Sequence, residues 1–269
     1  MDLKKLIKKH VVFFIIIVIV VILDLLLILA YTLNPDFYLP GIPALSTSYA
    51  KFGLSLQSVI FIYSLAIFLM YRWVKTGKKN TSTLLWSIAF IFYGIIFIGL
   101  IFNSFGLEWA NTTTEPILFF MWRNFMIIWV SLMYVGIAKI LTDSKKLQYY
   151  PAIIFVITGY IIFIIGLLVV QNINGTMAVF LYTLWCPLCM IIGYSFYLYG
   201  KQIKISSAMM ISIGFVLLGI TYMAWAPWHV GAVIEIYYFW FFMFNISLVL
   251  ILMGFVVMPF EIKAKKNVA

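Results

Sequence analysis

The sequence predicts an all-helical membrane protein, a polytopic bundle of eight transmembrane helices that form one integral membrane domain over residues 1–269. Two observations support this fold class. Of the 269 residues, 65% are hydrophobic and only 10% are charged, whereas roughly a quarter of the residues in a soluble domain are charged. The hydrophobic residues also gather in runs of about 20, the length that a helix needs to cross the hydrocarbon of a membrane. This composition cannot make a water-soluble surface, so the lipid bilayer is the expected partner of most of the chain.

Eight apolar runs are long enough to cross a membrane. They cover about 11–33, 53–74, 82–103, 116–141, 151–171, 177–199, 207–226 and 232–258. The first run is longer than the apolar core of a signal peptide, so we expect an uncleaved helix there. The last two runs are separated only by the segment "APWHVG" (226–231), but together they are too long for a single crossing.

Basic residues concentrate in alternate loops, and this predicts how the bundle is oriented. Lysine and arginine favour the cytoplasmic side of short loops. With eight crossings, one side of the membrane holds Lys4, Lys5, Lys8, Lys9, Arg72, Lys75, Lys78, Lys79, Lys145, Lys146, Lys201, Lys204, Lys263, Lys265 and Lys266. We therefore expect both termini in the cytoplasm. The net charge of +10 is spread over several short loops, so we expect contact with anionic lipid headgroups and no nucleic-acid partner.

Two segments suggest an internal repeat. "TSTLLWSIAFIFYGIIFIGL" (81–100) and "SSAMMISIGFVLLGITYMAW" (206–225) align without gaps, and the helices that follow them align after one gap. The identical pairs are Ser82/Ser207, Ser87/Ser212, Ile88/Ile213, Phe90/Phe215, Gly94/Gly219, Ile95/Ile220, Trp122/Trp240, Ile128/Ile246, Leu132/Leu250 and Gly136/Gly254. The pattern favours a parallel 4+4 duplication with halves 1–145 and 146–269 and a cleft between them. The alternative explanation is that biased composition imitates homology.

Ionisable residues inside a membrane span are costly, so each one needs a reason. Asp24 and Arg123 lie at matching depths in the outer half of their predicted helices, and we expect them to form an ion pair with Trp122 and Asn124 nearby. This pair is a candidate ligand-binding or ion site. Two alternatives remain: a buried pair that only fixes helix packing, and an Arg123 side chain that reaches the outer headgroups.

Asn245 lies near the middle of the last predicted span. A side-chain amide at this depth needs a hydrogen-bond partner, and a neighbouring helix usually provides it. Asn245 is therefore expected either to join two helices or to contribute to a ligand site.

The stretch "LWCPLCMI" (184–191) holds the only two cysteines, Cys186 and Cys189, on either side of Pro187. Residues three apart share one face of a helix, and Pro187 is expected to kink that helix because it cannot bond to the Thr183 carbonyl. The cysteines could be a redox pair, pass a soft metal ion, or pack as small apolar side chains. Thiol chemistry needs a thiolate, which lipid disfavours.

No familiar catalytic or cofactor motif occurs in the chain, so we expect no bound cofactor, no resident metal ion and, in the first instance, no enzyme activity. Three hypotheses follow for the function. The first is a small transporter or ligand-binding bundle of the cell membrane, with a polar site in its outer half. The second is a non-catalytic anchor or subunit of a larger membrane complex, or a homo-oligomer. The third is a membrane thiol oxidoreductase that uses Cys186 and Cys189.

Overall fold

The computed structural model describes residues 49–104, 116–169, 179–225 and 234–266, and every regular element in these ranges is helical. They are α3 (Tyr49–Lys75), α4 (Thr81–Ser104), α5 (Pro116–Leu141), α6 (Lys145–Leu168), a π-helical turn (Leu181–Trp185), α8 (Cys186–Ile203), α9 (Ser206–Trp225) and α10 (Ile234–Lys266). Seven helical segments are long and apolar enough to cross a membrane. The all-helical class is thus confirmed, and these segments fit a multi-pass membrane protein. The span predicted at 11–33 lies outside the described residues.

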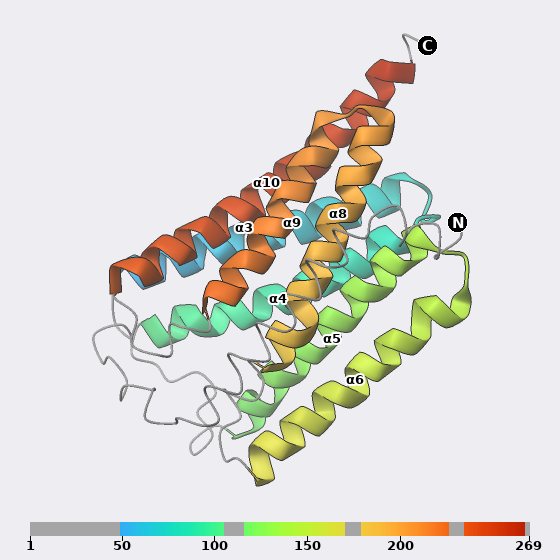
Figure 1. Ribbon diagram of the computed structural model, residues 1–269. Helices are drawn as coiled ribbons and strands as arrows, with labels where there is room; N and C mark the ends of the chain where they lie inside the picture. Colours follow the sequence, from blue (N-terminus) through green and yellow to red (C-terminus); the bar gives the residue numbers. More distant parts are fainter. Residues whose placement is uncertain (1–48, 105–115, 170–178, 226–233, 267–269) are drawn as a thin grey trace.

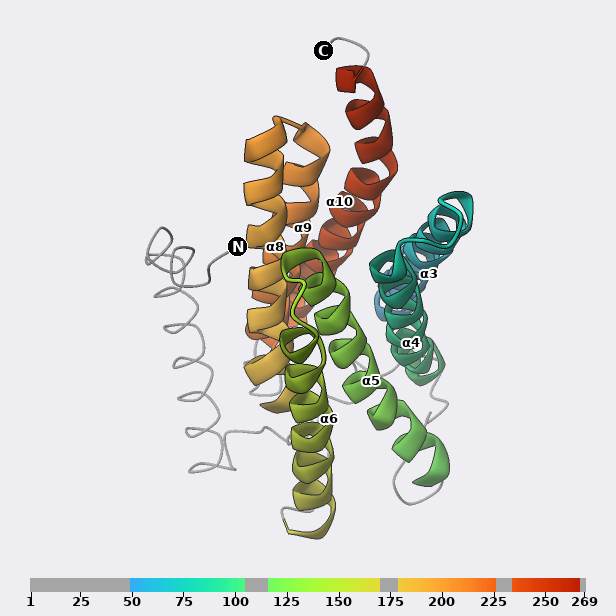
Figure 2. The same ribbon diagram turned by 90° about the vertical axis from the view of Figure 1, so that its right-hand side faces the viewer.

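Helices that follow one another along the chain pack side by side in the pairs α3–α4, α4–α5, α5–α6, α8–α9 and α9–α10 (Figure 1). In addition, α10 packs against α3, and α5 contacts α8 and the π-turn. These contacts arrange α3, α4, α5, α8, α9 and α10 around a shared core, while α6 packs against α5 at one edge of the bundle (Figures 1 and 2). The largest fully buried side chains of this core are aromatic and come from several of these helices.

Two helix pairs approach each other closely at glycines that the internal alignment matches. A Cβ atom on Gly136 of α5 would lie 2.1 Å from the Trp86 ring of α4. On α10, a Cβ atom on Gly254 would lie 2.5 Å from Ile211 of α9. Since Trp86 and Ile211 are themselves aligned positions, α4 packs on α5 in the same register as α9 packs on α10.

The structure differs from the sequence-based bounds at α6, which begins at Lys145 and contains Pro151. Hydropathy placed the start of this helix at the proline, because hydropathy marks where an apolar run begins and not where backbone hydrogen bonds begin. Pro151 has no N–H for the Leu147 carbonyl one turn earlier. The Tyr134 hydroxyl of α5 donates to that carbonyl instead, at 2.7 Å, so the helix continues through the proline.

The three short connections 76–80, 142–144 and 204–205 and the C-terminal end of α10 lie at one end of the bundle (Figure 1). We call this the lysine-bearing end, because it carries Lys75, Lys78, Lys79, Lys139, Lys145, Lys146, Lys201, Lys204 and Lys263. Here α10 continues through Pro259 to Lys266, well past the predicted limit at residue 258. Glu261 in this extension accepts hydrogen bonds from Ser206 and Ser207 at the start of α9, which ties the two helix ends together.

Candidate functional site

The helix that contains the two cysteines changes its hydrogen-bond register directly before them. Residues 181–185 form a π-helical turn, and the Cys186 N–H donates to the Leu181 carbonyl, five residues earlier. Pro187 follows within the first two positions of α8, where a missing N–H costs least. The sequence predicts a kink at this proline; the structure has a widened turn just before it. Such π-turns are uncommon and occur frequently at functional sites.

Neither cysteine is part of a disulfide, and both are fully buried. They lie at a close approach of α8 and α9, since a Cβ atom on Gly219 would be 3.1 Å from the Cys189 Cβ and 3.3 Å from the Cys186 carbonyl. A thiol that exchanges disulfides must be accessible to its partner. The burial of Cys186 and Cys189 therefore favours a packing role over thiol chemistry in this conformation.

Four aromatic residues meet beside the π-turn: Tyr93 of α4, Trp129 of α5, Trp185 of the π-turn and Tyr222 of α9. We call them the aromatic cluster. The two tyrosine hydroxyls lie 2.7 Å apart and share a hydrogen bond. The ring centroids of Tyr93 and Trp129 are 4.2 Å apart, and those of Trp129 and Trp185 are 5.0 Å apart in an edge-on arrangement. The cluster joins four segments at one point in the interior of the bundle.

Two polar groups of the aromatic cluster have no partner. The indole N–H groups of Trp129 and Trp185 are buried, and neither donates a hydrogen bond within the described residues. By contrast, the buried indole of Trp86 donates to the Met133 carbonyl at 3.2 Å. A buried donor without an acceptor costs about 1–3 kcal/mol. The apolar core therefore contains two unsatisfied donors beside a tyrosine pair, and a hydrogen-bond acceptor from outside the chain could satisfy them.

Asn245 of α10 is buried and hydrogen-bonded to α3 on two sides. Its amide nitrogen donates to the Leu54 carbonyl at 3.0 Å, and its amide oxygen accepts from the Ser58 hydroxyl at 2.6 Å. These bonds connect a late helix of the chain to an early one, as expected for a polar side chain that holds membrane helices together. Both ends of the amide are used, so Asn245 has little capacity left for a ligand.

The predicted ion pair cannot be located in the structure. Asp24 lies outside the described residues, and Trp122 and Arg123 belong to α5 without a described side chain. Asn124, the next residue of α5, is half-buried. The hypothesis of a site built on Asp24 and Arg123 remains a prediction.

The aromatic cluster was not among the sites predicted from the sequence. One signal was present: tyrosine and tryptophan are usually enriched at the two membrane interfaces, yet Tyr93 and Trp129 lie near the middle of α4 and α5. Their unusual position could have identified both residues as polar groups with a structural or functional role inside the bundle. Nothing in the sequence, however, indicates that they meet Trp185 and Tyr222.

The described part of the chain has no group of three or more His, Cys, Asp or Glu side chains that could hold a metal ion. Comparison with known proteins gives no match to a family model, to a curated protein or to a solved structure. The geometry of the bundle is therefore the basis for a functional proposal.

Proposed function

We propose that this chain is a small membrane transporter or ligand-binding bundle whose solute site is the aromatic cluster. The observation that carries the proposal is the pair of partnerless indole N–H groups of Trp129 and Trp185 beside the Tyr93 and Tyr222 hydroxyls. Such donors match a small solute with hydrogen-bond acceptors, such as carbonyl or carboxylate oxygens. When the solute binds, the cost of burying the two donors without partners is removed.

The conformation described here is a closed one in this proposal, since the rings of the cluster pack against each other. Entry of a solute requires the helices to separate at this point. The π-turn provides the movable element, because a helix that contains a π-turn and a proline is interrupted in its regular hydrogen-bond ladder. Broken helices line the substrate sites of many membrane transporters. Trp185, the last residue of the π-turn, would move with it.

The proposed architecture is the eight-helix bundle with a parallel 4+4 repeat and both termini in the cytoplasm. The matched contacts of Gly136 with Trp86 and of Gly254 with Ile211 support the repeat. With the lysine-bearing end in the cytoplasm, the aromatic cluster extends from the middle of the membrane toward its outer side, since Tyr93 and Trp129 are near the middle of their helices and Tyr222 is in the last turn of α9.

A thermal-shift screen of the purified full chain in lipid nanodiscs tests this function. The panel contains acetate, acetamide, urea, glycine, alanine and betaine, each at one ionic strength. At least one solute should raise the unfolding temperature of the wild type. The increase should be lost in Tyr222→Phe, which keeps the ring and removes the hydroxyl, and in Trp185→Phe.

Trp73→Phe is the matched control for Trp185→Phe. The Trp73 indole N–H is also buried without a partner within the described ranges, but it lies on α3 near Lys78 and far from the cluster. This control should keep the full response to the solute. Equal responses in Tyr222→Phe and the wild type, or no response to any of the solutes, would contradict the proposal. Co-purification of a stoichiometric foreign subunit would favour the alternative of a subunit in a larger complex.

A further inference from the structure

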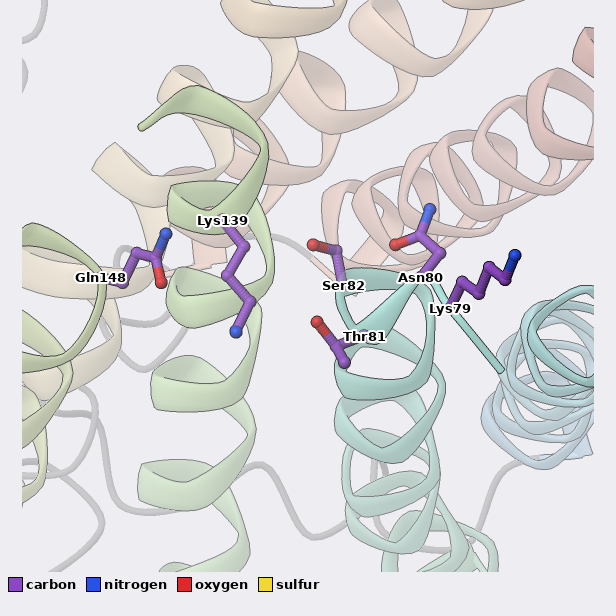
Figure 3. Close-up of a pocket in the computed structure, with 6 residues that line it drawn as sticks. All are labelled: Lys79, Asn80, Thr81, Ser82, Lys139 and Gln148. Carbon is purple, nitrogen blue, oxygen red and sulfur yellow. The ribbon is translucent and has the colours of Figure 1, made fainter. Parts of the chain in front are cut away.

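A polar pocket of about 430 Å³ opens at the start of α4, on the lysine-bearing end. The α3–α4 connection and three helices contribute to it (Figure 3). Its lining residues are Lys79 and Asn80 of the α3–α4 connection, Thr81 and Ser82 of α4, Lys139 of α5 and Gln148 of α6. The pocket is separate from the aromatic cluster, which lies in the interior of the bundle.

The electrostatics of the pocket favour an anion. The first backbone N–H groups of a helix have no partner within the helix and carry partial positive charge. Asn80 accepts from the Thr83 N–H at 3.3 Å, which leaves the N–H groups of Thr81 and Ser82 for another acceptor. Lys79 and Lys139 add two formal positive charges, and none of the described residues that line the pocket is acidic.

Ser82 gives an independent indication of a ligand site. This residue is only 7% exposed, and its hydroxyl has no hydrogen-bond partner among the residues that the structure describes. Figure 3 shows this hydroxyl directed toward Lys139, across the pocket. Because Ser82 lines the pocket, a ligand oxygen bound there would give this hydroxyl an acceptor.

The start of α9 shows what such an acceptor does. The sequence there is Lys-Ile-Ser-Ser (204–207), aligned with Lys-Asn-Thr-Ser (79–82) at the start of α4. The carboxylate of Glu261 accepts hydrogen bonds from both serine hydroxyls of this run and, at 2.9 Å, from the Ser207 N–H. The same arrangement of donors at α4 has no carboxylate from the described chain.

We propose that the pocket at the start of α4 binds a phosphate group, either of a lipid headgroup or of free inorganic phosphate. The phosphate oxygens accept hydrogen bonds from Thr81 and Ser82, in the same way that the Glu261 carboxylate accepts hydrogen bonds from Ser206 and Ser207. Lys79 and Lys139 neutralise its charge. A phosphate monoester carries a charge of about −1.5 to −2, which the two lysine charges balance. A carboxylate ligand would carry only one negative charge and would leave one lysine without a counter-charge.

The test measures thermal unfolding of the full chain in nanodiscs, with two arms that separate the sources of phosphate. In the first arm, inorganic phosphate is titrated at constant ionic strength in nanodiscs of neutral phosphatidylcholine. In the second arm, phosphatidic acid, whose headgroup is a phosphate monoester, is added to the nanodiscs without free phosphate. Stabilisation in the first arm assigns the site to free phosphate, and stabilisation only in the second assigns it to a lipid headgroup.

The variants are Lys139→Gln and Ser82→Ala, with Lys146→Gln as the matched control. Lys146 is an exposed lysine on the same end of the bundle that does not line the pocket. Loss of one hydrogen bond to a charged group should weaken the apparent affinity about tenfold in each pocket variant. The control should change it much less. The proposal is overturned if neither phosphate source stabilises the wild type, or if Lys146→Gln weakens binding as much as Lys139→Gln.

Discussion

The start of α4 and the start of α9 have matching sequences and different surroundings. Each begins with a hydroxyl pair, Thr81 and Ser82 in one case and Ser206 and Ser207 in the other. At α9 the Glu261 carboxylate satisfies the hydroxyls. At α4 the corresponding donors face an open pocket between two lysines. The comparison shows that, at the same end of the bundle, the chain itself supplies an acceptor for the donors at the start of α9, whereas the donors at the start of α4 face the pocket.

The helix pairs α4–α5 and α9–α10 share some features and differ in others. They share helix packing, since Gly136 contacts Trp86 and Gly254 contacts the aligned Ile211. They differ in polar contacts at the lysine-bearing end, where Glu261 accepts hydrogen bonds from the start of α9 and no described carboxylate does so at the start of α4. Three experiments test the shared packing and the polar difference, in decreasing order of expected effect.

The largest effect is expected from Gly254→Ala. The added Cβ would lie 2.7 Å from the Ser207 carbonyl and 2.5 Å from Ile211, and a backbone atom cannot move aside as a flexible side chain can. Overpacking of this kind costs about 1–3 kcal/mol. The measurement is the midpoint of thermal unfolding by circular dichroism in detergent. Gly53→Ala is the control, because a Cβ there meets nothing within 4 Å. Equal midpoints for the two variants would show that the close approach of α9 and α10 is not real.

A smaller effect is expected from Glu261→Ala, which removes the acceptor from the start of α9. Because the carboxylate is partly exposed to solvent, which screens its interactions, the loss should be about 1 kcal/mol. The variant also makes α9 resemble α4, so inorganic phosphate should restore part of the lost stability. Thermal unfolding with and without phosphate measures this. Lys263→Ala, an exposed neighbour on α10, should show neither effect. If phosphate stabilises Glu261→Ala no more than the wild type, the two helix starts are not equivalent.

The smallest effect is expected from the aligned pair Ser87 and Ser212. The buried Ser87 hydroxyl donates to the Ala66 carbonyl of α3 at 2.7 Å, so Ser87→Ala should lose about 0.5–1.5 kcal/mol. Ser212 is also buried, but its hydroxyl has no partner in the described part of the protein. Ser212→Ala should therefore leave the unfolding midpoint unchanged or slightly higher. A larger loss for Ser212→Ala than for Ser87→Ala would reverse the expected order.

The fold class could be predicted because composition and run length depend only on the solvent around the chain. The bounds of α5, 116–141, agree with the apolar run that predicts it. The bounds of α6 and α10 do not agree, because their ends continue beyond the apolar run and are fixed by hydrogen bonds. Tyr134 supports α6 across Pro151, and Glu261 ties the end of α10 to α9.

The candidate site was much less predictable. The sequence marked the region of Pro187 as a disturbed helix and Asn245 as a side chain that needs a partner, since both statements concern single residues. The aromatic cluster depends on how four segments are rotated about their axes. Helices that are apolar all round carry no pattern that defines this rotation, so the meeting of Tyr93 with Tyr222 could only come from the structure.

Because of the π-turn at 181–185, deleting one residue should disturb this helix more than substituting one. A π-turn holds one residue more than the regular helix needs, so deleting one residue would let the segment close into a continuous α-helix. Each residue of an α-helix turns the chain by about 100°, so the deletion would rotate the side chains of the helical segment before Cys186 relative to those of α8. In any relative of this protein, a one-residue gap at this point would therefore mark the loss of the aromatic cluster more clearly than any single substitution.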